Sequence, residues 1–265
     1  MSARIAIATA ALITLLAPVA GATPSGKPRA RSGAHHPSGH TDRWTTICPG
    51  IRHLHRRTPE PLSVHVLVVD LRAPGVVVEG TPYEQRWLKP SQYGRVSGAV
   101  AAINGGFWSV FDQKAEGLVM HGGRRWKGAR DDEFYGFFAI RKDGRAEISD
   151  PERVVSKVAG LREAISGRQL ILSGGKVTRG ARCADGCRYR QPRTAVGTSR
   201  DGHRVFLTVV DGRQKHSRGI SLVNLARLLA ALGADRVINL DGGGSAAMYL
   251  TTKKGLVNRP ADRRD

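Results

Sequence analysis

The sequence lacks the features that would place it at once in several large classes. It has no internal repeat of the solenoid kind, and its three cysteines do not supply two ligand pairs at zinc-finger spacing. No RRM or helix-turn-helix pattern accompanies its positive charge. The apolar run 5–16 is too short to cross a bilayer, which takes roughly 20 residues, and no other stretch is long and apolar enough. These absences argue against a nucleic-acid-binding protein and against a membrane-spanning one.

Acidic residues are scarce, because 22 Asp and Glu face 42 Lys and Arg and leave a formal net charge of +20 with a pI near 10.9. A positive field of this kind concentrates anionic ligands and speeds their capture. The cations are spread over the whole chain and form no nucleic-acid motif. The partners that we expect are therefore phosphorylated glycans or anionic cell-wall polymers, with no nucleic acid.

The N-terminus has the pattern of a secretory signal peptide. Residues 1–4 are short and basic, residues 5–16 are apolar, and Ala20-Gly-Ala22 offers small residues for cleavage. We predict a signal peptide over 1–22, and hence a secreted protein that is extracellular or associated with the cell wall. No membrane span is expected once the signal is removed.

Two further segments follow. Residues 23–45 combine Pro, Gly and positive charge with no apolar periodicity, which predicts a flexible basic tail. Residues 46–265 are enough for one domain with a core of its own. This segment would carry the catalytic function.

Strand signals dominate that domain. Apolar or alternating runs bounded by turn residues predict strands at 62–70, 76–79, 96–103, 134–141, 145–148, 169–172, 193–197, 204–210, 236–240 and 246–250. One helix is clear, over 221–232, where leucines recur at spacings of three and four between the N-cap Ser221 and Gly233. We expect an α+β (mixed α/β) domain with a mixed, strand-rich sheet, one β-α-β crossover and several hairpins.

Two carboxylates follow the strands that this helix connects. Asp211 ends strand 204–210 and Asp241 ends strand 236–240. Strands joined by a crossover run parallel, so both residues should lie on one rim of the sheet. Two carboxylates at such a rim suit cleavage of a glycosidic bond, one protonating the leaving oxygen while the other attacks or activates water. Asp-Gly is also common turn chemistry, and for Asp211 the two interpretations are evenly balanced.

Glycines and one arginine complete the predicted pocket. Side-chain-free backbone lets N–H groups approach an anion, and three strand ends carry such a pattern. We predict catalytic roles for Asp241, Asp211, Asn104 and Arg193. The predicted substrate-binding residues are Gly105, Gly106, Arg213, Gly242, Gly243, Gly244, Ser245 and Arg259. Arg193 stands in an apolar strand and could hold a phosphate through two hydrogen bonds.

Cys183 and Cys187 enclose a turn-like Asp-Gly, and in an exported protein they should form a disulfide. Cys48 is left over, either as a buried thiol or as a partner of one of the other two. No ligand spacing indicates a metal, so we expect no cofactor. A divalent cation such as calcium or magnesium, held by clustered Asp, stays open.

Motifs in a fixed order resemble those of the phosphodiester glycosidase family. They are Asn104-Gly-Gly-Phe-Trp, Ala164-Ile-Ser-Gly, Arg193-Thr-Ala-Val-Gly, Asp211-Gly-Arg, Gly219-Ile-Ser-Leu, Leu232-Gly-Ala, Asn239-Leu-Asp-Gly-Gly-Gly-Ser and Asn258-Arg-Pro. The resemblance spans roughly 62–262. It implies hydrolysis of a bond between a sugar's anomeric carbon and a phosphodiester, in a pocket that Asn104, Arg193, Asp211 and Asp241 line.

Two other functions compete with this one. An α-glycosidase acting on a neutral wall polysaccharide or exopolysaccharide would need the carboxylates but no phosphate-binding Arg193. A non-catalytic module that binds an anionic cell-wall polymer would use the basic surface, with an affinity that falls steeply with salt. That module leaves the carboxylates at the rim unexplained.

Overall fold

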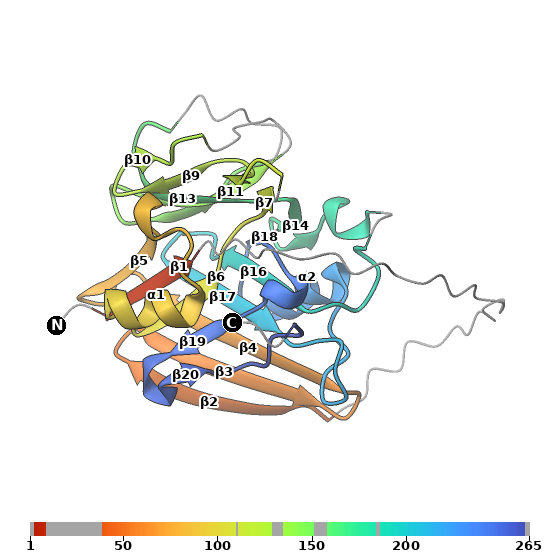
Figure 1. Ribbon diagram of the computed structural model, residues 1–265. Coiled ribbons are helices and arrows are strands. Elements are labelled where there is room, and N and C mark those ends of the chain that lie inside the picture. Colours follow the sequence, from red (N-terminus) through yellow and green to blue (C-terminus); the bar gives the residue numbers. More distant parts are fainter. Residues whose placement is uncertain are drawn as a thin grey trace.

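The computed structural model describes residues 3–8, 39–109, 111–128, 135–150, 158–183 and 186–262. Sheets dominate these residues (Figure 1), and the α+β (mixed α/β) class expected from the sequence is wrong. The fold is β-rich, with two α-helices in the described ranges. The predicted leader cleavage after Ala22 and most of the predicted tail lie outside the described residues.

The largest sheet has eight strands, in the order β15-β14-β18-β16-β17-β4-β3-β2. Every neighbouring pair in it is antiparallel. The strands are β2 (Thr41–Cys48), β3 (Ile51–Thr58), β4 (Leu62–Asp70), β14 (Gln169–Ser173), β15 (Lys176–Val177), β16 (Arg193–Thr198), β17 (Arg204–Val210) and β18 (Arg236–Asn239).

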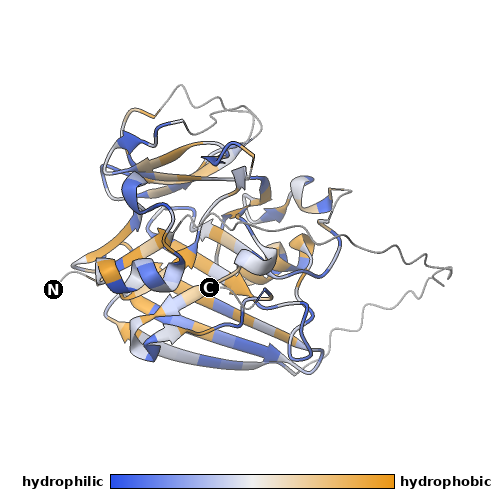
Figure 2. Ribbon diagram, viewed as in Figure 1, coloured by the Kyte–Doolittle hydropathy of each residue, from blue (hydrophilic) through white to orange (hydrophobic). Residues whose placement is uncertain are grey.

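The mistaken fold class arose from β17 and β18. The order strand, helix, strand predicts that the helix between them is the crossover of a parallel α/β unit. In the structure β16 lies between the two strands and pairs antiparallel with both. The two strands still end at the same edge, but the sheet around them is antiparallel. Residues 41–45, expected in the tail, form the start of β2. The sequence does not separate the two because an exposed, polar edge strand has the composition of a tail (Figure 2).

A second sheet has five strands, in the order β20-β19-β6-β1-β5. They are β1 (Ala3–Ala8), β5 (Val76–Gly80), β6 (Ala101–Asn104), β19 (Met248–Leu250) and β20 (Gly255–Leu256). The first core cluster packs between this sheet and the largest one. It includes Leu67, Leu207 and Ile238 from the larger sheet and Ile5, Ile103 and Met248 from the smaller.

Strand β1 comes from the segment that the sequence predicts to be a leader. It pairs in parallel with β5 on one side and β6 on the other. Ile5 and Ala6 are fully buried and Ile7 is 2% exposed. The apolar residues that a signal peptide requires also suit the middle of a buried sheet, so the sequence pattern alone does not separate the two uses.

A third sheet, above the others in Figure 1, has the order β10-β9-β13-β11-β12. Its strands are β9 (Val119–His121), β10 (Arg124–Arg125), β11 (Gly136–Arg141), β12 (Ala146–Ile148) and β13 (Leu161–Gly167). The short antiparallel pair β7 (Trp108–Ser109) and β8 (Lys114–Ala115) precedes β9 in the sequence.

The helices are α1 (Pro90–Ser97) and α2 (Leu222–Ala231). Helix α2 is the predicted one, and the Ser221 hydroxyl accepts from the backbone N–H of Asn224 as its N-cap. It buries Leu222, Leu225 and Leu229 against the outer face of the largest sheet. Helix α1 takes up the start of the strand predicted at 96–103, because Gly98 ends the helix in a left-handed conformation at φ 66°.

The predicted disulfide between Cys183 and Cys187 is confirmed, and Cys48 is a free, half-buried thiol. Among the described residues, no helix is long and apolar enough to cross a membrane.

Strand β1 provides a stability test. Replacing the fully buried Ile5 by Ala should lower the free energy of unfolding by about 2–5 kcal/mol, as expected for a large-to-small core substitution. The neighbouring Arg4 is exposed, and Arg4→Ala should change it by less than about 0.5 kcal/mol. Urea unfolding of the full chain measures both. Equal stability of Ile5→Ala and the parent protein would show that β1 contributes nothing to the core.

Candidate functional site

The motif loops converge at one edge of the largest sheet. Strands β17 and β18 end on either side of the start of β16, so the Cα atoms of Asp211 and Asp241 are separated by roughly two strand spacings, about 10 Å. Pro192 lies close to the glycine that follows each aspartate. A Cβ added at Gly212 would lie 2.5 Å from the Pro192 N, and a Cβ added at Gly242 would lie 2.8 Å from the Pro192 O. The shared rim predicted from the sequence is present in the structure.

Asn104 joins the second sheet to this edge. Its Oδ1 accepts from the Thr194 hydroxyl at 2.7 Å and from the backbone N–H of Ala247 at 3.1 Å. Its Nδ2 donates to the Asp241 carbonyl at 2.8 Å. Asn104 is 3% exposed, so its amide is committed to positioning the Asp241–Ser245 loop.

Asp241 opens that loop with a half-buried side chain. Its Oδ1 accepts from the backbone N–H of Gly242 at 2.9 Å. Burial raises the pKa of its carboxyl, while hydrogen bonds from Ser245 and Gly242 act in the opposite direction. A carboxyl whose pKa is raised keeps its proton to higher pH, which is the property of a general acid.

The glycines act less through free N–H groups than the sequence suggests. Gly243 donates to the Pro192 carbonyl and Ser245 to the Gly242 carbonyl, so both donors are already used. What the glycines provide is close approach. Gly243 has φ 62°, and an added Cβ there would lie 3.4 Å from the guanidinium of Arg213.

Gly244 has the tightest approach of the loop. A Cβ at this position would lie 1.8 Å from the Asp262 carboxylate, so any other residue would displace that side chain. Asp262 is exposed and forms no ion pair with another described residue. The sequence analysis did not select it, because a lone acid two residues after a proline carries no recognisable pattern. The structure therefore adds a second carboxylate at the Asp241–Ser245 loop.

Asp211 is placed differently. It is 2% exposed, and its Oδ1 accepts from the Asn258 amide at 3.1 Å and from the Arg259 backbone N–H at 2.8 Å. Its Oδ2 pairs with His216 Nε2 at 3.1 Å. All of these contacts fasten the C-terminal segment and the 211–218 loop. Both oxygens of the Asp211 carboxylate are therefore already bonded in this arrangement.

Arg193 points to the other face of the sheet. Its neighbour Thr194 bonds Asn104, whereas the side chains of Arg193 and Ala195 alternate onto the face that α2 covers. Its guanidinium donates to the carbonyls of Gly186, Tyr189 and Ile220. Burial, and then the charge of Arg213, lower the pKa of Arg193 to about 10. The structure uses Arg193 to hold the disulfide loop.

A third sheet contributes polar groups that the sequence analysis missed. Arg168 pairs with Glu116 at 2.7 Å and stacks over Phe107, with its guanidinium carbon 4.4 Å from the ring centroid. Tyr135 donates to the same Glu116 carboxylate. The Arg168 backbone N–H donates to the Asn239 carbonyl at 3.1 Å, two residues before Asp241, so this cluster lies near the loop.

Histidines line the cavity on the far side of Asp211. His53 Nε2 lies 3.1 Å from His65 Nδ1, and His65 stacks on His55 with centroids 4.2 Å apart. His55 Nε2 lies 3.0 Å from the Ser63 hydroxyl. The cavity measures about 360 Å³ and is also lined by Arg57, Asp211, His216 and Arg259. Among the described residues, no group of three or more His, Cys, Asp or Glu is arranged to hold a metal ion.

Comparisons with known proteins agree with the motifs. The family model "Phosphodiester glycosidase" matches residues 97–265. The chain is 32% identical over 252 residues to N-acetylglucosamine-1-phosphodiester alpha-N-acetylglucosaminidase of Bos taurus, covering 87% of this chain and 45% of that protein. The Mus musculus enzyme of the same name is 29% identical over 184 residues, covering 63% of this chain and 34% of that protein.

Solved structures share the fold. The zebrafish N-acetylglucosamine-1-phosphodiester alpha-N-acetylglucosaminidase catalytic domain, auto-inhibited by its pro-peptide, aligns with a TM-score of 0.60 at 21% identity, over 86% of this chain and 78% of that one. A hypothetical protein from Synechocystis aligns with a TM-score of 0.56 at 15% identity, over 82% of this chain and 60% of that one. The chain spans less than half the length of the curated mammalian relatives.

The histidine cluster makes stability depend on pH. Burial is the main cause that lowers the pKa of His53 to about 4 and that of His65 to about 2. The unfolded chain takes up a proton at each near pH 6.5, whereas the folded chain does not, so stability falls as the pH drops below about 6.5. At pH 5 each histidine should cost about 2 kcal/mol relative to pH 7. The raised pKa of Asp241 acts in the opposite sense.

Urea unfolding at pH 5, 6 and 7 measures this dependence. His53→Gln and His65→Gln should flatten it, whereas His40→Gln, at an exposed histidine, should leave it unchanged. The assignment fails if the parent protein and His65→Gln lose the same stability between pH 7 and pH 5.

Proposed function

Because this chain belongs to the phosphodiester glycosidase family, we propose that it hydrolyses the bond between the anomeric carbon of a sugar and a phosphodiester. The observation that carries the proposal is the Asp241–Ser245 loop, where two carboxylates and the Arg213 guanidinium meet a backbone free of side chains. N-acetylglucosamine is the first sugar to test, since the relatives' names specify it.

Arg213 is the phosphate-binding group in this proposal. Its side chain is exposed, and its Nε donates to Gln191 Oε1 at 2.8 Å, which leaves the terminal nitrogens directed at Gly243. The fork of a guanidinium matches two phosphate oxygens. Its backbone has φ 58°, an uncommon conformation for a residue with a side chain, which the surrounding loop holds in place.

Asp241 acts as the acid and Asp262 supplies the second carboxylate. The raised pKa of Asp241 favours a protonated carboxyl, which can donate to the departing phosphate oxygen. A neutral acid also repels an arriving phosphodiester less than a carboxylate does. Asp262 then attacks the anomeric carbon or activates a water there, the two roles open to the partner carboxylate of a glycosidase.

Export is part of the same proposal. The disulfide between Cys183 and Cys187 supports it, since disulfides persist in oxidising compartments. We place the protein outside the cell or at the cell wall. Fractionation of the producing cells tests this placement, and recovery from the cytoplasm alone would contradict it.

Asp241→Asn should reduce hydrolysis of UDP-N-acetylglucosamine by about 10²–10⁴-fold in kcat, because the amide has no proton to transfer. Asp262→Asn should reduce it by at least as much if the carboxylate attacks the anomeric carbon. Asp70 lies at the opposite end of the sheet in a surface pair with Arg72, and Asp70→Asn is the matched control. Free sugar released per minute is the readout. Full activity of Asp241→Asn would remove the proposed acid.

Arg213→Gln distinguishes a phosphodiester substrate from a neutral glycoside. Loss of the guanidinium should lower kcat/KM for UDP-N-acetylglucosamine by about 10²-fold or more, since charge pairing with phosphate is lost. Hydrolysis of p-nitrophenyl glycosides, if present, should change little. Arg227→Gln on the exposed face of α2 serves as control. Cleavage of the neutral glycosides alone by the parent protein would favour the α-glycosidase function instead.

A further inference from the structure

A group of exposed cations surrounds the 211–218 loop, and we name it the cationic strip. It comes from three segments that are distant in sequence: the end of β3, the loop itself, and the segment after β20. Its members are Arg57, Arg213, Lys215, Arg218 and Arg259. Each of them lines one of two neighbouring hollows in the surface.

The two hollows lie on either side of the same loop. The first is the cavity of about 360 Å³ that Arg57, His216 and Arg259 line. The second measures about 560 Å³ and is lined by Pro61, Arg190, Arg213, Gln214, Lys215 and Arg218. Both hollows border the turn between β3 and β4 as well as the 211–218 loop, so they are neighbours on the surface between Arg57 and Arg218.

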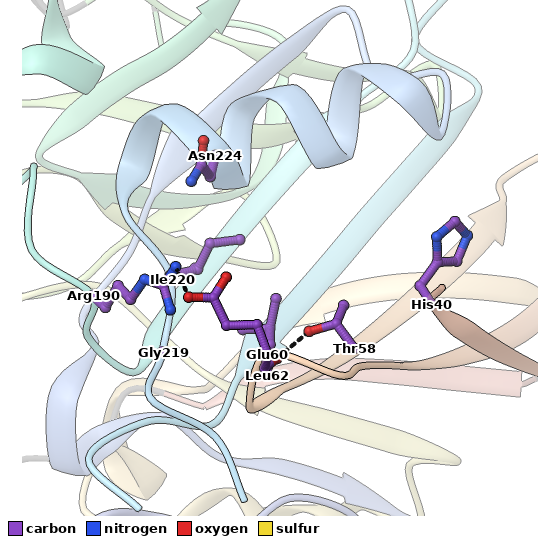
Figure 3. A pocket seen from close by; sticks show the side chains of 8 residues that line it. All are labelled: His40, Thr58, Glu60, Leu62, Arg190, Gly219, Ile220 and Asn224. Atoms are coloured by element: carbon purple, nitrogen blue, oxygen red, sulfur yellow. Dashed lines mark hydrogen bonds and ion pairs between the residues drawn. The ribbon is translucent and has the colours of Figure 1, made fainter. Parts of the chain in front are cut away.

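The strip is not neutralised by the protein itself. Among the described residues, no carboxylate lies within ion-pair distance of any of its five members. Arg190 at the edge of the second hollow differs, since Glu60 pairs with it at 2.5 Å (Figure 3). Arg56, Arg168, Arg200 and Arg236 are also paired with carboxylates elsewhere on the surface.

Hydrogen bonds hold the strip in a fixed shape. The Arg218 backbone N–H donates to the Pro61 carbonyl at 2.8 Å, and the Ser63 N–H donates to the Ser217 hydroxyl at 3.1 Å. Gln214 Nε2 donates to the Arg259 carbonyl at 2.6 Å. Like charges held close together repel one another, and a ligand of opposite charge would relieve that repulsion without first ordering the loop.

The strip begins at the proposed reaction site. Arg213 faces Gly243 of the Asp241–Ser245 loop, and it lines the second hollow together with Lys215 and Arg218. Arg213 is the group that we assign to the scissile phosphate. The remaining cations would therefore contact what lies beyond that phosphate, on the side opposite the sugar.

We propose that the group beyond the scissile phosphate is itself polyanionic, a chain of repeated phosphate groups that lies along the cationic strip. This inference rests on the proposed function for its orientation, though not for the binding itself. A nucleic acid is less suited, because the described residues that line the two hollows include no Phe, Tyr or Trp on which bases could stack.

The test uses the full chain with Asp241→Asn, so that binding is measured without turnover, and inorganic polyphosphate as the probe. Isothermal titration should give saturable binding that weakens with salt. Adding Lys215→Gln and Arg218→Gln should weaken it at least tenfold and reduce the slope of log Kd against log salt by about two. Arg124→Gln with Lys142→Gln, two exposed cations on the third sheet, is the matched control and should change neither.

Three results would overturn the proposal. They are the absence of saturable polyphosphate binding, equal losses in the two double variants, and tighter binding of single-stranded DNA of the same charge. The outcome is separable from that of the proposed function. Sugar release from UDP-N-acetylglucosamine without polyphosphate binding removes the strip alone, whereas binding without any sugar release leaves the strip and removes the reaction.

Discussion

The buried side chain of Asn104 sets the geometry of the whole edge. One amide accepts from Thr194 on the largest sheet and donates to the carbonyl that begins the Asp241–Ser245 loop. It also accepts from Ala247, just before β19. Both sides of the loop are therefore bonded to the end of β6. Removing a buried amide with three partners would cost free energy of folding, because those partners would be left without hydrogen bonds. The position of Asp241 depends on contacts that lie outside its own strand.

Charge is distributed unevenly between the two sides of that edge. Asp211 is buried with hydrogen bonds at both oxygens, and three neighbouring imidazoles have pKa values that burial lowers. The surface above them carries unpaired cations. A tightly bonded interior thus supports a positive exterior, and the exterior charges remain available to a ligand because Asp211 beneath them is already bonded to other groups.

The sequence predicts strands, turns and the single clear helix well, because leucine spacing and turn residues are local signals. It also brings Asp211 and Asp241 to one edge. It fails where tertiary pairing decides. The insertion of β16 between β17 and β18 depends on non-local hydrogen bonds that no helix-and-strand order reveals. In the same way, the direction of the Arg193 side chain on β16 and the approach of Asp262 to Gly244 appear only in three dimensions.

Strand β1 has a consequence for the order of events during synthesis. Its residues are made before those of its partners β5 and β6, which follow some 70 to 100 positions later, as the pairs Ala3 with Val76 and Ala8 with Asn104 show. The slot between those strands cannot exist until residue 104 has been made, and such non-local pairing is slow. During that interval β1, which is apolar apart from Arg4, has no strand to pair with. Capture by an export pathway and insertion into the sheet therefore compete for the same six residues, and the delay before β6 is made leaves time for capture.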